Sequence, residues 1–205
     1  MKQLFSGFHE RVILFLSQKH RQKMTGWAKA GSCAFESVFY LFIVPVILLM
    51  IGNIIFPGTS VSLSDGSFRF MMIFSILAAL YGLLLMALCM RELWIYGSGS
   101  AAVNAPPQKL VTTGPYSLSR NPLVIGNLIY YAGIAFLISG SLEIFLLTVV
   151  ITSVPAYFYH KYFEEPELEK AFGDEYADYK SRVPGLIPIG EKKPIQNLKQ
   201  YFFRK

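Results

Sequence analysis

The sequence is poor in charged residues. Only 16% of its 205 residues are charged, whereas 53% are hydrophobic. The charges gather towards the ends of the chain and leave long uncharged runs between them, a pattern that a soluble domain of this size rarely shows. We therefore expect an integral membrane protein with one domain over residues 1–205.

Cysteine is scarce as well. Cys33 and Cys89 stand far apart and form neither a CxxC pair nor a spacing that suits metal ligands. We interpret both as reduced packing residues, and we expect no metal site.

Four segments are long and apolar enough to cross a bilayer. A hydrocarbon core of about 30 Å needs a helix of about 20 apolar residues. The candidate spans are residues 35–56, 70–96, 122–139 and 142–163. The predicted fold class is therefore all-α, a polytopic membrane bundle of about four transmembrane helices. Apolar residues also recur at helical spacing in residues 1–34 and 168–183, so we expect an amphipathic surface helix at each end.

Lysine and arginine are distributed unevenly between the loops. Residues 57–68 and 140–141 carry none, whereas both flanks and the middle loop, residues 97–121, do. By the positive-inside rule, both termini and the middle loop should be cytoplasmic. The net charge of +6 lies mostly on the flanks and favours membrane lipids, not nucleic acid, as partners. The apolar run at residues 12–16 is too short for a signal-peptide core, so we expect the N-terminus to be retained.

The last two spans should form an antiparallel hairpin, because only residues 140–141 separate them. Arg120 and Asn121 stand just before the third span. Glu164 and Glu165 stand just after the fourth. A hairpin returns the chain to its starting side, so the two pairs should meet at one membrane face, the cytoplasmic one.

Each of these residues has an ordinary explanation when it is taken alone. Asn121 followed by Pro122 is a favourable helix start. Arg120 equally suits a lipid headgroup, and either glutamate alone is explained as a solvated interface residue. Gly97-x-Gly99 after a helix is usually a cap and hinge.

Taken together, the residues suit a ligand that carries a carboxylate, a cation and ribose hydroxyls. Arg120 and the N-terminus of the helix that begins at Pro122 suit the carboxylate. A glutamate suits the ammonium group or the ribose, and we favour Glu165 as the one that faces the ligand. Glycines allow a close approach to the backbone. S-adenosylmethionine has all of these groups, and we predict it as the cofactor.

An ordered set of motifs runs through residues 91–188. Its members are Leu110-Val111-Thr112-Thr113-Gly114-Pro115-Tyr116, Arg120-Asn121-Pro122, Gly126, Glu164-Glu165, Leu168, Phe172-Gly173, Tyr176, Tyr179 and Val183-Pro184. This set resembles the isoprenylcysteine carboxyl methyltransferase and phospholipid methyltransferase superfamily. The resemblance implies a pocket for S-adenosylmethionine at the cytoplasmic face and a lateral opening for a lipophilic acceptor.

The motifs and the reasoning from single residues give one set of candidate site residues. The candidate catalytic residues are Arg120, Asn121 and Glu165. The candidate cofactor-binding residues are Gly97, Gly99, Gly114, Tyr116, Arg120, Asn121, Pro122, Glu164, Glu165, Tyr176 and Tyr179.

Three positions depart from the pattern of the family that the motifs resemble. Asn121 stands where that family usually has histidine, Val124 replaces a usual tyrosine, and Gly185 replaces an arginine that often follows Val-Pro. Asparagine forms hydrogen bonds but cannot act as a titrating base. These departures bear more on the acceptor than on the cofactor.

The sequence thus predicts methyl transfer from S-adenosylmethionine to a lipophilic or membrane-soluble acceptor, such as an isoprenylcysteine carboxylate or a phospholipid. In-line displacement would depend mainly on positioning the two substrates. A carboxylate acceptor needs no general base, whereas an amine or thiol does, and the sequence identifies none. The alternatives are a membrane enzyme resembling sterol reductases, with NADPH as cofactor, and a non-catalytic scaffold or transporter. The glutamate pair suits a cationic cofactor better than a pyrophosphate.

Overall fold

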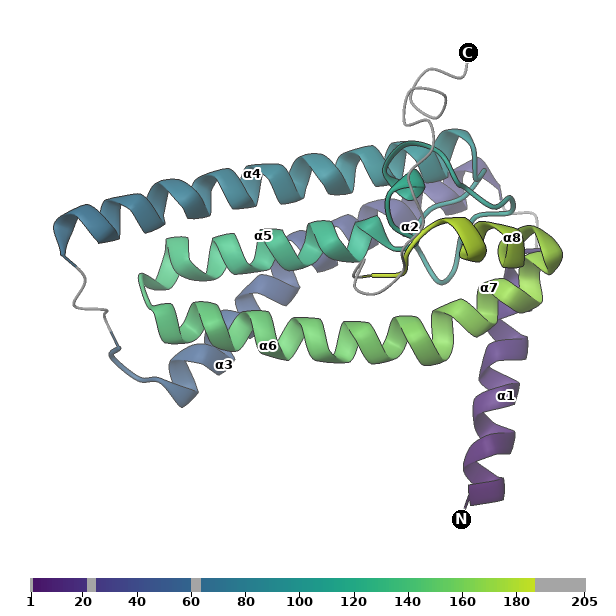
Figure 1. The fold of residues 1–205 in the computed structure, drawn as a ribbon, viewed down its shortest axis with the longest axis horizontal. Helices are drawn as coiled ribbons and strands as arrows, with labels where there is room; N and C mark the ends of the chain where they lie inside the picture. The colour runs from purple at the N-terminus through teal and green to yellow at the C-terminus, as the bar shows by residue number, and fades with distance from the viewer. Residues whose placement is uncertain (1, 22–24, 60–63, 187–205) are drawn as a thin grey trace. The chain divides into compact units, whose positions relative to one another are not determined.

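A computed structural model describes residues 2–21, 25–59 and 64–186, and every element of regular secondary structure in these residues is a helix (Figure 1). This confirms the all-α class. The α-helices are α1 (Lys2–Lys19), α2 (Gly26–Val38), α3 (Val44–Ile55), α4 (Asp65–Ile95), α5 (Pro122–Ser139), α6 (Leu142–Tyr159), α7 (Glu165–Phe172) and α8 (Asp174–Arg182). Between them lie two π turns, η1 (Phe39–Ile43) and η3 (His160–Glu164), and one 3₁₀ turn, η2 (Gly114–Ser117).

Four helical stretches are long and apolar enough to cross a membrane, as expected. They are Gly26–Ile55, Asp65–Ile95, Pro122–Ser139 and Leu142–Phe172. Three of them extend beyond the predicted spans, because helical hydrogen bonding continues where the hydropathy of the sequence has already fallen. The first and fourth stretches each contain a π turn, with Pro45 and Pro166 close behind it.

The helix does not end at the glutamate pair, and our prediction that the helix of the fourth span ends at residue 163 is wrong. Pro166 has no N–H to donate, and the π turn η3 precedes it, with the N–H of Glu165 donating to the carbonyl of His160. The helix therefore runs from α6 through η3 into α7. Glu164 and Glu165 lie inside it and not at a C-terminus.

The described chain forms two compact units. Of the described residues, the loop unit contains 2–21, 25–34, 88–122 and 157–186, and the span unit contains 35–59, 64–87 and 123–156. The boundaries fall inside α2, α4, α5 and α6.

In the span unit, α4 and α5 pack closely at glycines. A Cβ atom at Gly82 would lie 2.7 Å from the carbonyl oxygen of Gly126, and one at Gly133 would lie 2.7 Å from the carbonyl oxygen of Ser75. Small residues let membrane helices approach in this way. Figure 1 shows α4, α5 and α6 running alongside one another.

The outer face of α4 carries large apolar side chains that no other helix covers in the described chain. Phe70, Leu77 and Leu84, spaced by seven residues, are all exposed. Such a stripe of exposed apolar side chains suits contact with lipid, in agreement with a membrane span.

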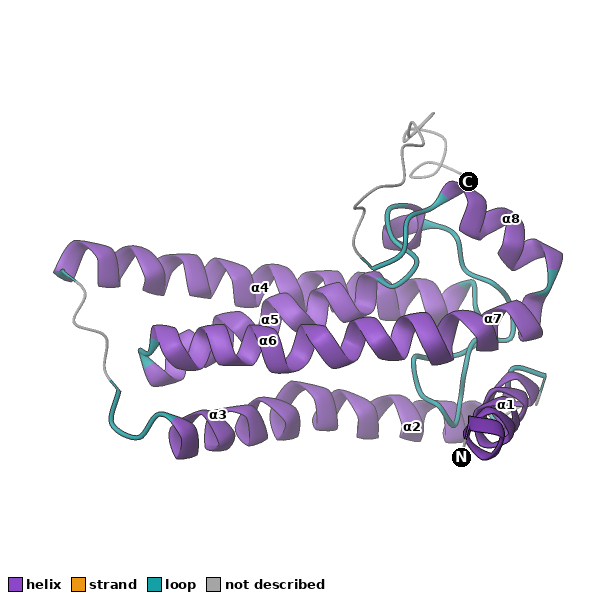
Figure 2. Cartoon of the chain, turned by 60° about the horizontal axis from the view of Figure 1, so that its bottom comes forward, coloured by secondary structure: helices purple, strands orange, loops and turns teal. Residues whose placement is uncertain are grey.

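In the loop unit, α1 packs against α7 (Figure 2). The Nε2 atom of His9 lies 2.7 Å from the carbonyl oxygen of Tyr162. The ring of His20 lies between the carbonyl oxygen of Pro107, 2.6 Å from Nδ1, and the Oε1 atom of Glu167, 2.9 Å from Nε2. The N-terminal helix therefore contacts protein on this side.

The predicted amphipathic surface helices are not confirmed. Residues 2–19 form α1, and residues 26–34 belong to α2, which runs on into the first span. At the other end, Gly173 interrupts the expected helix because its φ of 56° favours glycine, so α7 and α8 are separate. Their apolar side chains pack on one another and on the middle loop, in a cluster of Tyr176, Tyr179, Val183, Leu110, Leu168 and Phe172.

Candidate functional site

The predicted meeting of the two polar pairs is present in the loop unit. Two additional residues, His160 and Lys180, join them there. We call the resulting group the Arg120 cluster, and its members are Arg120, Asn121, His160, Glu164, Glu165 and Lys180.

Glu165 is the neutralised carboxylate of this cluster. Its Oε1 atom accepts hydrogen bonds from Nε and Nη2 of Arg120, at 3.2 and 2.5 Å. Its Oε2 atom lies 2.9 Å from Nζ of Lys180, and its Oε1 atom lies 3.3 Å from Nε2 of His160. The Glu165 side chain is only 11% exposed. Three cationic or titratable groups of the protein itself thus surround it.

Lys180 remains charged in this position. Partial burial lowers its pKa, but hydrogen bonds to Glu169 and Glu165 outweigh that effect and raise the pKa above its ordinary value.

Arg120 also holds the segment after α8. Its Nη1 atom donates to the carbonyls of Lys180 and Val183, at 3.1 and 2.6 Å, and its backbone N–H donates to the carbonyl of Pro184 at 2.9 Å. The guanidinium is therefore buried and committed to protein partners. We predicted Arg120 as a direct ligand of the cofactor carboxylate, and these contacts give it a second task, that of holding Glu165 and the end of α8.

Glu164 is the more exposed carboxylate, with 30% of its side chain accessible. Its Oε2 atom accepts hydrogen bonds from Nδ2 of Asn121 and, at 2.9 Å, from Nδ1 of His160. Adjacent residues of a helix point about 100° apart, which explains why the two glutamates have different surroundings. We favoured Glu165 as the residue that faces the ligand, and that role stays a prediction, but the contacts favour Glu164.

Gly114 lies against a buried carboxylate. It has a φ of 57°, and a Cβ atom there would lie 2.9 Å from Cγ of Glu92. Glu92 accepts a hydrogen bond from Thr113 Oγ1 at 2.6 Å and from Arg91 Nη1 at 3.0 Å. The end of α4 thereby fixes the turn that leads to the Arg120 cluster.

Gly97 and Gly99 follow the end of α4, as predicted. A Cβ atom at Gly99 would lie 2.5 Å from the carbonyl oxygen of Pro106, and one at Gly97 would lie 2.6 Å from the carbonyl oxygen of Leu93 and 2.9 Å from Cβ of Pro107. In the described chain, the close backbone approach that these glycines permit is made by the middle loop at Gly99 and by the last turn of α4 at Gly97. Their role in cofactor binding remains a prediction.

One candidate tyrosine, Tyr179, holds the middle loop, in which a second one, Tyr116, lies. The hydroxyl of Tyr179 donates to the carbonyl of Tyr116 at 2.6 Å and lies 3.4 Å from that of Ser119. Burial raises the pKa of Tyr179 and of Tyr116, so both stay neutral hydroxyls. Next to them, Pro122 begins α5 as the sequence predicted.

Tyr176 differs from Tyr179. It is fully buried, and its hydroxyl has no hydrogen-bond partner among the residues that the structure describes. A buried hydroxyl without a partner is unfavourable, so it suits a polar group supplied by a ligand or by water.

Sequence reasoning missed His160, Lys180 and Glu92 as members of this region. The sequence could have identified His160, since it stands four residues before Glu164 and so lies on the same face of the helix. No feature of the sequence identified Lys180 and Glu92, because only the folded chain brings them near the motifs.

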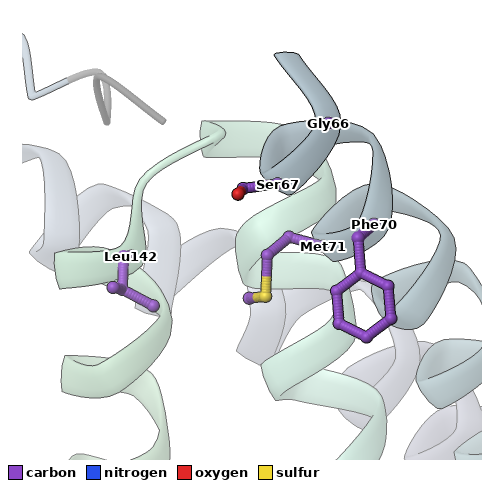
Figure 3. A pocket seen from close by; sticks show the side chains of 5 residues that line it. All are labelled: Gly66, Ser67, Phe70, Met71 and Leu142. Atoms are coloured by element: carbon purple, nitrogen blue, oxygen red, sulfur yellow. The ribbon is translucent and has the colours of Figure 1, made fainter. Parts of the chain in front are cut away.

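A pocket lies elsewhere, in the span unit (Figure 3). It is lined by Gly66, Ser67, Phe70, Met71 and Leu142. None of the predicted site residues lines it.

The sequence model of the phospholipid methyltransferase family matches residues 70–175, just over half of the chain. The chain belongs to this family. The matched region includes every member of the Arg120 cluster except Lys180, and it confirms the resemblance that the motifs indicated. Membership makes the protein a methyltransferase of the membrane-embedded type.

One curated relative matches part of the chain. Protein-S-isoprenylcysteine O-methyltransferase B of Arabidopsis thaliana is 32% identical over 82 residues, which are 40% of this chain and 40% of that protein. The match thus spans less than half the length of this relative. No solved structure matches the chain.

Proposed function

We propose that this family member transfers a methyl group from S-adenosylmethionine to a lipophilic acceptor, and that the Arg120 cluster forms part of the cofactor site. The observation that carries the proposal is the Glu164 carboxylate, which is partly exposed while Asn121 and His160 hold one of its oxygens. Family membership supports the reaction class.

The residues present fit such a cofactor. A partly exposed carboxylate suits an ammonium group or ribose hydroxyls, and the buried hydroxyl of Tyr176 offers a donor and an acceptor. When bound, S-adenosylmethionine supplies a methyl group that its sulfonium makes electrophilic.

The chain's own residues would then bind and orient. Glu164 would attract the cationic end of the cofactor. Arg120 would act mainly by holding Glu165 and the end of α8 in place, since its guanidinium already bonds to both. The reaction would depend on positioning, as expected for a methyl group that arrives already activated.

The acceptor should come from the bilayer. The spans expose apolar side chains along their length, which suits a lipid environment, and we place the cluster and both termini on the cytoplasmic side by the positive-inside rule. An isoprenylcysteine-like or phospholipid acceptor agrees with the names of the matching family and relative. Reduction with NADPH and a non-catalytic role are not favoured, because family membership indicates methyl transfer.

Two measurements on the purified full chain test the proposal. Calorimetry should detect binding of S-adenosylmethionine and not of NADPH. A labelled-methyl assay over prenylcysteine, phosphatidylethanolamine, thiol and quinone-like acceptors should then identify the acceptor. Protein that is folded but binds no S-adenosylmethionine would contradict the proposal.

A matched pair of variants assigns the binding to the cluster. Glu164→Gln should weaken S-adenosylmethionine binding by roughly tenfold or more, because a charge-assisted contact is lost. Glu175→Gln, which changes an exposed glutamate of α8 outside the cluster, should leave it unchanged. Equal affinities in the two variants would remove Glu164 from the site.

A further inference from the structure

His160 is a buried histidine at the start of η3, and its side chain is only 4% exposed. Its Nδ1 atom lies 2.9 Å from Oε2 of Glu164, and its Nε2 atom lies 3.3 Å from Oε1 of Glu165. The ring thus stands between the two adjacent carboxylates. The second contact is at ion-pair distance but is not aligned as a hydrogen bond.

The two neighbours of the ring determine which form of histidine fits. A neutral imidazole carries one N–H and directs a lone pair from its other nitrogen, whereas the imidazolium carries two N–H groups. Both ring nitrogens of His160 face carboxylate oxygens, which are acceptors. The doubly protonated form therefore matches the surroundings, and either neutral tautomer would place a lone pair against a carboxylate.

Two other charged groups lie near the ring, and they come from different segments. Arg120, just before α5, and Lys180, on α8, both contact Glu165. The Nδ2 atom of the neutral Asn121 amide, itself a donor, lies 3.3 Å from Nδ1, farther than the Oε2 atom of Glu164 at 2.9 Å. A Cβ atom at Gly185 would lie 3.8 Å from Nε2, so that segment approaches the ring without placing a side chain there.

The two glutamates consequently depend on His160 to different degrees. Glu165 has an arginine and a lysine as partners in addition to the ring. Glu164 is held by the ring and by the neutral amide of Asn121. Loss of the His160 charge should therefore affect Glu164 more than Glu165.

We propose that His160 is a positioning residue, an imidazolium that bridges Glu164 and Glu165 and holds the Glu164 carboxylate in its ligand-facing orientation. The role of His160 in positioning Glu164 for a ligand rests on the proposed methyl transfer, whereas the imidazolium bridge between the two glutamates does not. His160 touches no reacting atom in this role. It acts through Glu164, in company with Asn121.

The bridge is testable without any ligand. Nitrogen-15 spectra of the histidine rings in the full chain, with the His160 signals identified by their loss in His160→Gln, should show both ring nitrogens protonated at pH 7. A single protonated nitrogen at that pH would overturn the proposal. This result is independent of methyl transfer, so it separates failure of the bridge from failure of the proposed function.

Variants test the positioning role. His160→Phe keeps a ring and removes both donors, and it should weaken S-adenosylmethionine binding by about tenfold, the effect of one lost charge-assisted hydrogen bond. His160→Gln keeps a neutral donor and should recover part of that loss. Wild-type affinity should change with pH as His160 loses its proton, whereas His160→Gln should lack that change.

A control variant and a contrary outcome complete the test. His9→Phe changes another histidine of the loop unit, one whose ring contacts the Tyr162 carbonyl, and should leave cofactor binding and its pH profile unchanged. If His160→Phe fails to fold, the nitrogen-15 spectra still test the bridge, and the pH profile of His160→Gln still tests the positioning role. An identical pH profile in wild type and His160→Gln would overturn the positioning role.

Discussion

Arg120 and Glu165 form a buried ion pair although 45 positions separate them in the sequence. Both Nε and Nη2 of the guanidinium donate to the same carboxylate oxygen. The pair joins the segment before α5 to the helix that continues α6, inside one compact unit. Burial of two charges is costly unless each is well partnered, and here the arginine has two backbone carbonyls and the glutamate a lysine and a histidine as further partners.

A double-mutant cycle should measure a substantial coupling between these two residues. Arg120→Ala and Glu165→Ala should each destabilise the protein, by about 3 kcal/mol, because each leaves a buried charge short of a partner. The double variant should lose less than the sum, with a coupling energy of about 1 to 3 kcal/mol. Reversible unfolding in detergent measures both quantities.

The exposed pair Asp178 and Arg182 provides the control for that cycle. It has the same charge types in a helical i, i+4 arrangement, and about half or more of each side chain is exposed. Its coupling should be a few tenths of a kcal/mol at most, since solvent screens it. Equal coupling in the two cycles would show that Arg120 and Glu165 are not paired as described.

The two glutamates should contribute differently, Glu165 to stability and Glu164 to ligand binding. Glu165→Gln removes the charge that three partners contact, so it should lower the thermal unfolding temperature. Glu164→Gln should change that temperature little and reduce turnover by roughly tenfold or more. Glutamine keeps the size of the side chain, so the comparison isolates the charge. The reverse pattern would return the ligand-facing role to Glu165.

Two tyrosines of α8 should respond differently to loss of the hydroxyl. Tyr179→Phe removes the hydrogen bond to the Tyr116 carbonyl and should cost about 1 to 2 kcal/mol of stability. Tyr176→Phe should cost almost none, because its hydroxyl has no partner among the described residues. Chemical denaturation of the two variants side by side makes the comparison. A similar loss from both would indicate that water or the rest of the chain satisfies Tyr176.

The orientation of the chain can be tested by cysteine labelling in a background without Cys33 and Cys89. Pro57→Cys, in the first inter-helix loop, should react with an impermeant thiol reagent applied to intact cells. Val103→Cys, an exposed position in the middle loop, should react only after the membrane is opened. Both predictions follow from the absence of lysine and arginine in the first loop. The opposite labelling pattern would place the Arg120 cluster outside.

The candidate site was predictable where a topological argument was available. The two-residue turn at Gly140 and Ser141 requires a hairpin, and a hairpin brings Arg120 and Glu165 to the same end. His160 was identifiable by its spacing from Glu164. Lys180 was not, because its position depends on the break at Gly173 that turns α8.

The sequence by itself determined the all-helical class, the four apolar stretches and the family, because hydropathy, helical periodicity and ordered motifs are properties of the chain alone. Only the tertiary structure decided which carboxylate each cation neutralises. Hydrogen-bond partners and burial depend on distances of a few ångströms between distant segments, and these distances give the adjacent Glu164 and Glu165 different partners. The Glu165 side chain is buried among protein partners, whereas 30% of the Glu164 side chain is accessible.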